Sequence, residues 1–93
     1  MIQHNQYHGG KVQSLGFENE EGRVTAGVMA PGEYQFGTSE DERMVVTSGQ
    51  MHVRLPDADD HQPFATGDEF FVAAGNQFDV KIESPVAYLC FYG

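Results

Sequence analysis

The feature that most constrains this chain is a two-residue alternation of apolar and polar side chains that never persists for long. Every second residue is apolar in residues 51–55, and residues 77–83 repeat the pattern. This period is that of a β-strand with one buried face, whereas no segment keeps a helical period over three turns. Further strands are predicted at residues 11–17, 23–30, 33–38, 42–48, 69–74 and 86–92.

The segments between these predicted strands carry Gly, Pro, Asn or Asp, which favour turns. These breaks fall at residues 9–10, 18–22, 31–32, 48–49, 56–60, 66–68, 74–76 and 84–85. Short strands that recur about every eight to twelve residues are typical of an all-β sandwich or barrel. A chain of 93 residues has room for one hydrophobic core, so we expect residues 1–93 to form a single domain.

The charge balance excludes several classes of partner. The chain has 14 acidic and 5 basic residues and a formal net charge of −9, which argues against binding nucleic acid or an anionic membrane. Its single cysteine, Cys90, forms neither an internal disulfide nor a thiolate zinc site. No apolar run is long enough to span a membrane, and residues 1–11 lack the apolar core of a signal peptide. We therefore expect a cytoplasmic protein.

Two segments, GEYQFGTSEDERMVVTSG at residues 32–49 and GDEFFVAAGNQF at residues 67–78, resemble the paired motifs of the cupin family. The glycine spacing of both motifs is kept. Thr38, Glu40 and Phe78, however, occupy the positions at which cupins carry metal-binding histidines. The resemblance implies an all-β fold, a single cupin-type antiparallel barrel of the jelly-roll kind.

Only one metal ligand of the cupin pattern remains, Glu42, and a single carboxylate does not hold a transition metal. None of the four histidines has ligand spacing with another; they are His4, His8, His52 and His61. The sequence therefore predicts a protein without a metal or other cofactor. A metal-dependent cupin that uses Glu42 with His52 or other unusual ligands is the less favoured alternative.

The resemblance narrows to one family when the segments are taken together. Residues 32–58, the opening NQYHGGKVQSLGF at 5–17 and the ending AYLCFY at 87–92 are similar to the pyrimidine/purine nucleoside phosphorylases, which are small single-domain cupins. The resemblance implies a metal-free homodimeric enzyme of broad specificity. It would cleave uridine, adenosine, guanosine, cytidine, thymidine, inosine and xanthosine with inorganic phosphate to free base and pentose 1-phosphate. A non-catalytic cupin that binds a nucleoside or sugar is the alternative.

Phosphorolysis needs a cationic site for phosphate but no covalent nucleophile, because phosphate itself attacks the sugar. Arg23 is the first candidate among the five basic residues, since a guanidinium binds two phosphate oxygens at once. Its alternative role is a surface ion pair with Glu20 or Glu21. Lys11 and Arg54 are the next candidates, and a solvated lysine at the strand edge is the alternative reading of Lys11.

The cupin pattern places Thr38 in the barrel interior, and alternation then turns Glu40 and Glu42 inward as well. A buried Glu42 would have a raised pKa suited to a general acid, or would stay ionised and bind the ribose hydroxyls. The sequence leaves both roles open, together with a third in which Glu42 is exposed beside Arg43. Aromatic walls for the base are predicted at Tyr34, Phe36, Phe78 and Tyr88.

Overall fold

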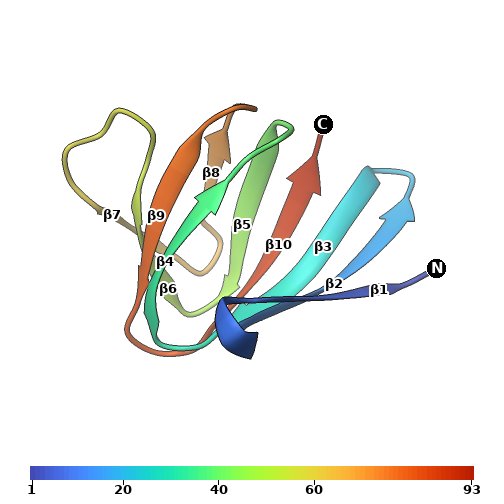
Figure 1. The fold of residues 1–93 in the computed structure, drawn as a ribbon, viewed down its shortest axis with the longest axis horizontal. Helices are drawn as coiled ribbons and strands as arrows, with labels where there is room; N and C mark the ends of the chain where they lie inside the picture. Colours follow the sequence, from blue (N-terminus) through green and yellow to red (C-terminus); the bar gives the residue numbers. More distant parts are fainter.

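The computed structural model describes all residues, 1–93, as ten strands and one short 3-10 helix (Figure 1). The elements are β1 (Gln3–Tyr7), η1 (His8–Gly10), β2 (Val12–Asn19), β3 (Gly22–Met29), β4 (Gly32–Gly37), β5 (Glu42–Ser48), β6 (Gln50–Arg54), β7 (Gln62–Ala65), β8 (Glu69–Val72), β9 (Gln77–Ile82) and β10 (Val86–Tyr92). No helix of the structure is long and apolar enough to cross a membrane.

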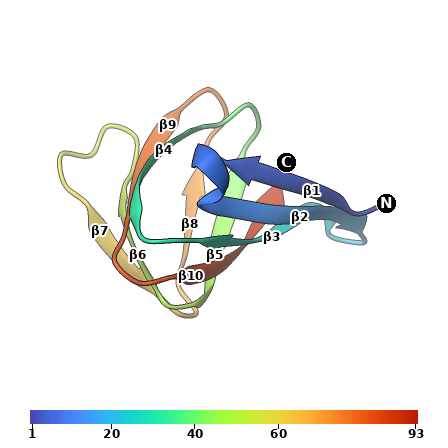
Figure 2. The same ribbon diagram turned by 60° about the horizontal axis from the view of Figure 1, so that its bottom comes forward.

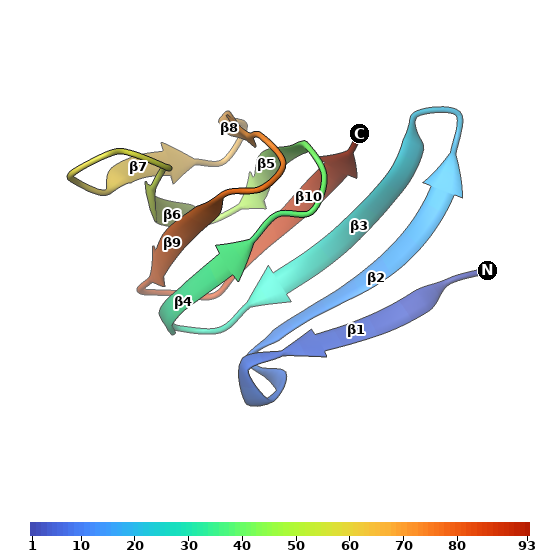
Figure 3. The same ribbon diagram turned by 45° about the horizontal axis from the view of Figure 1, so that its top comes forward.

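The strands form two antiparallel sheets that enclose the core. The larger sheet has the order β1-β2-β3-β10-β5-β8, and the smaller has the order β4-β9-β6-β7. Figure 2 shows the smaller sheet packed over one end of the larger, while β1 and β2 extend beyond it, as Figure 3 also shows. The predicted all-β cupin-type barrel is confirmed.

All eight predicted strands are present with bounds that differ by at most two residues, and two further strands were missed. The first, β1, reads QHNQY and contains no apolar alternation. The second, β7, contains Pro63, which argues against a strand in the sheet interior. Both lie at the edge of their sheet, where a strand is stabilised by pairing on one side rather than by a buried apolar face.

The core is a single cluster of 15 buried residues between the sheets. Its shape depends on one close contact, in which Gly27 of β3 stands opposite Tyr88 of β10. A Cβ atom at Gly27 would lie 2.4 Å from Cζ of Tyr88, so the tyrosine ring occupies the space that a side chain would fill. This contact fixes Tyr88 against the inner face of the larger sheet.

Candidate functional site

A cavity of about 140 Å³ lies between the two sheets, and its rim includes the end of the larger sheet where β3 and β5 begin and β10 ends. Most of its polar lining comes from the larger sheet, whereas the smaller sheet contributes aromatic and small residues. The lining residues are Tyr7, Ser14, Thr25, Met29, Phe36, Gly37, Glu42, Met44, Phe78, Tyr88, Cys90 and Tyr92.

Strand register brings the polar groups together. Thr25 of β3 and Met44 of β5 both pair with Cys90 of β10, so these three residues form one row across the sheet. Two residues along β10, Tyr92 pairs with Glu42 at the start of β5 and forms the next inward row. Alternation therefore turns the carboxylate of Glu42 into the cavity, as the sequence predicted.

Glu42 is the carboxylate that lines this cavity. Its Oε1 accepts a hydrogen bond from Sγ of Cys90 at 3.4 Å. The pKa of the Glu42 carboxyl is raised above its ordinary value, mainly because the group is partly buried, and the nearby Glu40 carboxylate adds to the rise. The hydrogen bond from the Cys90 thiol and the positive charge of Arg23 act in the opposite direction and lower this pKa. Glu42 is thus a half-buried acid whose charge depends on the groups at the cavity mouth.

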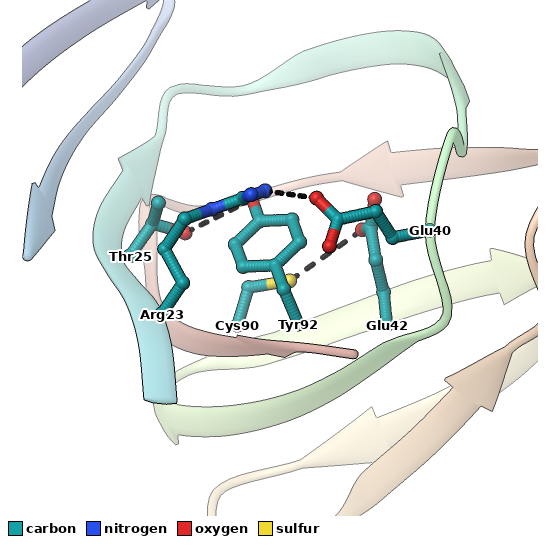
Figure 4. Close-up of polar contacts among 6 residues, drawn as sticks. All are labelled: Arg23, Thr25, Glu40, Glu42, Cys90 and Tyr92. Atoms are coloured by element: carbon teal, nitrogen blue, oxygen red, sulfur yellow. Dashed lines mark hydrogen bonds and ion pairs between the residues drawn. The ribbon is translucent and has the colours of Figure 1, made fainter. Parts of the chain in front are cut away.

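Arg23 and Glu40 form an ion pair at that mouth. Figure 4 shows the Arg23 side chain reaching from β3 toward Glu40, which lies in the loop before β5. The guanidinium carbon lies 4.4 Å from the centroid of the Tyr92 ring, a cation–π contact. The prediction that Arg23 pairs with Glu20 or Glu21 is wrong, because Glu40, which is distant in sequence, is its partner.

The remaining polar groups of the cavity are neutral donors and acceptors. Burial is the main cause that raises the pKa of Tyr88 to about 12 and the pKa of Cys90 to about 12, and burial also raises the pKa of Tyr92. The Tyr92 hydroxyl lies 3.4 Å from Oγ1 of Thr25. The cavity therefore offers several hydroxyl groups, one thiol and the carboxyl group of Glu42, which is a lining suited to a polyhydroxylated ligand.

Six of the nine predicted site residues converge on this region. Four line the cavity, namely Phe36, Glu42, Phe78 and Tyr88, and Arg23 and Glu40 stand at its mouth. The rings of Phe36 and Phe78 pack with centroids 5.6 Å apart and form the apolar wall contributed by the smaller sheet. Their roles in substrate binding remain predictions.

The other three predicted site residues lie outside the cavity. The Tyr34 hydroxyl donates to the carbonyl of Ala30 at 2.6 Å and is engaged in the core. Oγ1 of Thr38 donates to the carbonyl of Ala73 at 2.8 Å and accepts from the backbone N–H of Asn76 at 3.0 Å, so it ties two loops together. Lys11 borders a hollow on the outer face of the larger sheet.

Sequence reasoning missed four polar residues of the cavity, Tyr7, Ser14, Thr25 and Tyr92. Tyr7 escaped because β1 has no apolar alternation. Tyr92 could have been found, because it follows Tyr88 and Cys90 at the same two-residue spacing on a predicted strand. Ser14 and Thr25 gave no signal beyond lying on the inner side of their strands.

The structure contains no group of three or more His, Cys, Asp or Glu residues arranged to hold a metal ion. Of the two residues of the metal-dependent alternative, Glu42 lines the cavity, whereas His52 lies between the buried Met51 and Val53 on β6 and therefore points to the opposite side of its strand. The donor set therefore does not fit a cupin metal centre.

A larger hollow of about 770 Å³ lies on the outer face of the larger sheet, and we call it the outer hollow. Its apolar side chains include the exposed Leu15 and Val28. No aspartate or glutamate lines it. We place the candidate active site at the smaller cavity, because converging polar groups with shifted pKa values are found there.

Comparison with known proteins identifies relatives of this chain. A family model described as "Pyrimidine/purine nucleoside phosphorylase" matches residues 2–92, which confirms the resemblance found in the motifs. A protein of that name from Pseudomonas putida (strain GB-1) is 50% identical over 92 residues, covering 99% of this chain and 98% of the relative. Another from Rhodopirellula baltica is 46% identical over 91 residues, covering 98% of this chain and 99% of the relative.

Solved structures share the fold over the whole chain. A protein of unknown function from Vibrio parahaemolyticus superposes with a TM-score of 0.94 at 40% identity and covers 100% of this chain and 99% of its own. A putative ethanolamine utilization protein from Salmonella typhimurium has a TM-score of 0.72 at 15% identity and covers 97% and 91%. The second likeness shows the fold alone.

Proposed function

The chain belongs to the pyrimidine/purine nucleoside phosphorylase family, and from that premise we propose that it is a cytoplasmic pentosyltransferase of broad specificity. Its substrates are uridine, adenosine, guanosine, cytidine, thymidine, inosine and xanthosine. Inorganic phosphate is the co-substrate, the products are free base and pentose 1-phosphate, and no cofactor takes part. The observation that supports this proposal best is the convergence of Arg23, Glu40 and Glu42 on one cavity lined by hydroxyl groups.

In the proposed reaction a phosphate oxygen attacks the anomeric carbon of the pentose. The new C–O bond forms as the bond to the base nitrogen breaks, and the bonding electron pair leaves with the base, which then takes up a proton. The sugar carries positive charge in the transition state, as it does in glycoside hydrolysis. Catalysis therefore requires an anion site, a negative group close to the sugar, and an exit for the base.

Arg23 is the proposed phosphate ligand. Its guanidinium forms an ion pair with the carboxylate of Glu40 at the cavity mouth, and about half of the Arg23 side chain is exposed to solvent. A phosphate dianion can replace Glu40 there, because a guanidinium binds phosphate with two parallel hydrogen bonds. Exposed ion pairs contribute little stability, so the exchange costs little folding energy.

Glu42 is proposed to act in its ionised form. Its carboxylate lines the cavity, where it can accept hydrogen bonds from the pentose hydroxyls and stabilise the positive charge that develops on the sugar. The alternative, in which protonated Glu42 donates to the departing base, predicts the opposite pH dependence. Activity that falls as the pH is lowered through the raised pKa of Glu42 supports the ionised role, whereas activity that falls as the pH is raised supports the acid.

The experiment that tests the function is incubation of the protein with uridine or adenosine, with and without phosphate, followed by quantification of base and pentose 1-phosphate. We expect both products in equal amounts and only with phosphate. Arg23→Ala should raise the KM for phosphate, whereas Arg43→Ala, which removes a similar cation on the outer face, should not. Base release that ignores phosphate contradicts the proposal, and nucleoside binding without turnover identifies the non-catalytic alternative.

We also propose that the chain forms a homodimer through the outer hollow. The chain carries 14 acidic residues and a net charge of −9, which in general opposes the association of two copies. The outer hollow is free of carboxylates and exposes Leu15 and Val28, so two copies can meet there without like-charge repulsion. Sedimentation velocity measures the oligomeric state.

A further inference from the structure

The cavity at Glu42 is too small for a whole nucleoside. Its volume is about 140 Å³. Sites for ligands of drug size typically have volumes of roughly 300–1,000 Å³. A cavity of this volume has room for one part of a nucleoside, such as the pentose, but not for a pentose and a base together, so part of a nucleoside bound there must lie outside the cavity.

A second hollow, which we call the β1 groove, continues from the cavity to the surface. It has a volume of about 400 Å³. Tyr7, Thr25 and Tyr92 line both the groove and the cavity, so the two spaces meet at these residues. Arg23, the proposed phosphate ligand, lines the groove next to this junction.

One wall of the β1 groove is formed by alternate residues of β1. Gln3, Asn5 and Tyr7 line the groove, whereas His4, from the opposite side of the strand, lines the outer hollow. Nδ2 of Asn5 lies 3.4 Å from Oγ of Ser14, a cavity residue. The strand therefore places two primary amides along the path that leads out of the cavity.

The floor of the groove opposite Gln3 is Gly16. A Cβ atom at Gly16 would have Thr25, Asn5 and Gln3 as its nearest neighbours at 3.7–3.8 Å, so the glycine leaves space in the groove without a close contact. Phe17 and Tyr92 add aromatic surface beside this space. The groove thus carries aromatic rings and amide groups on its walls, together with the charged side chains of Glu18 and Arg23.

Aromatic rings and primary amides together suit a nucleobase. A ring stacks on any base, and an amide both donates and accepts hydrogen bonds, so it pairs with the polar edge of a purine or a pyrimidine. On the premise of the proposed function, we propose that the base of the nucleoside lies in the β1 groove against Gln3 and Asn5, while the pentose occupies the cavity at Glu42. The anomeric carbon then lies at the junction, within reach of a phosphate bound to Arg23.

This placement also accounts for broad specificity. An enclosed pocket distinguishes bases by size, but an open groove accepts one or two rings. Adaptable amides do not impose a fixed order of donors and acceptors. The edge strand β1, rather than the aromatic residues Tyr34, Phe36 and Phe78 of the barrel interior, is therefore the element that contacts the base.

The test measures the base separately from the sugar by running the reaction in the direction of nucleoside synthesis. Gln3→Leu and Asn5→Leu each remove an amide from the groove, whereas Gln6→Leu makes the same change on the opposite side of β1. We expect each groove variant to raise the KM for uracil and for adenine about tenfold, as expected from the loss of a hydrogen bond. The KM for ribose 1-phosphate and the values for Gln6→Leu should change less than twofold.

Failure of the placement and failure of the function give different results. In the first case, wild-type protein makes nucleoside. The groove assignment is then wrong if Gln3→Leu and Asn5→Leu leave the KM for both bases unchanged, or if Gln6→Leu raises this KM by the same factor. If wild-type protein makes no product, the side-chain amide NMR signals of Gln3 and Asn5 are followed as uracil is added. Signal shifts confined to these two amides would show that the groove binds a base although the protein is not a phosphorylase. If the signals do not shift, both the groove assignment and the proposed function are wrong.

Discussion

The two faces of the larger sheet are built by the same strands but have opposite chemistry. Its inner face gathers hydroxyls, a thiol and the Glu42 carboxylate around a small cavity, whereas its outer face carries the larger outer hollow, which has no carboxylate. Because successive side chains of a strand point to opposite faces, each strand contributes to both. A chain of 93 residues can thus carry a candidate reaction site and an apolar surface on opposite faces of one sheet.

Two arginines make the contrast specific. Arg23 on the inner side pairs with Glu40 and stacks 4.4 Å from Tyr92, while Arg43 on the outer side pairs with Glu69 and stacks 4.3 Å from Phe91. Their local contacts are nearly the same. They differ in what surrounds them, because Arg23 borders the cavity and the β1 groove whereas Arg43 borders a shallow surface depression. Local pairing alone therefore does not identify a functional cation.

The largest effect is expected when the inner face loses its charge. Glu42→Gln keeps the size and the hydrogen-bond acceptor of the side chain but removes the negative charge beside the sugar. We expect kcat to fall by about 100-fold or more, the range seen when a transition-state charge loses its partner. Steady-state kinetics with uridine measure this, and Glu69→Gln on the outer side is the control that should retain full activity.

The same substitution tests the cost of burying Glu42. Burial raises the pKa of Glu42 in the folded protein above its ordinary value of 4.5, so from that pH upward the folded protein holds more protons than the unfolded chain. Stability then falls with rising pH in this window. Urea denaturation from pH 4 to pH 8 should show that wild type loses stability relative to Glu42→Gln as pH rises. A constant difference between the two contradicts a raised pKa.

The outer face is tested by a charge placed in the outer hollow. Leu15→Glu puts a carboxylate on the apolar surface that the proposed dimer would bury, where removing the charge from water costs several kcal/mol even if Lys11 lies nearby. We expect the dimer dissociation constant to rise at least 100-fold in sedimentation experiments. Phe71→Glu, at an exposed apolar residue outside the hollow, is the matched control. A monomeric wild type, or equal effects of both variants, removes the outer hollow as an interface.

The close contact between β3 and β10 should be the next most sensitive feature. Gly27→Ala places a Cβ atom 2.4 Å from the Tyr88 ring, which forces the ring into the cavity. We expect a loss of about 1–3 kcal/mol in the free energy of unfolding, as for other overpacked cores. Gly16→Ala on the same face, where the nearest atom would be 3.7 Å away, should change stability by less than about 0.5 kcal/mol. Equal urea midpoints would show that Tyr88 moves freely.

The fold was largely predictable because its apolar alternation is strong. Residues 51–55 and 77–83 carry apolar side chains at every second position, and the structure has strands there, β6 and β9. The same alternation correctly turned Glu42 inward. Strand β1 was not predictable, since its residues are polar on both sides and it is held by pairing with β2.

The candidate site was predictable only in part, because it depends on contacts between segments distant in sequence. Proximity along the chain suggested Glu20 and Glu21 as partners of Arg23. In the folded barrel, however, Arg23 pairs with Glu40, which lies in the loop between β4 and β5. Thr38 matched a cupin ligand position by counting, yet its hydroxyl is occupied by the 73–76 loop. Spacing identifies the positions of such residues, but the pairing of the two sheets decides their partners.

The smallest predicted effect separates charge from shape at the two arginines. Arg23→Lys keeps the positive charge and can still pair with Glu40, but it loses the planar fork that binds two phosphate oxygens. We expect the KM for phosphate to rise about fivefold with kcat nearly unchanged, a smaller effect than that of Arg23→Ala. Arg43→Lys should leave phosphate kinetics unaltered despite its equivalent stacking and pairing. If the two lysine variants behave alike, phosphate does not bind at the cavity mouth, and the functional distinction between the two faces rests on Glu42 alone.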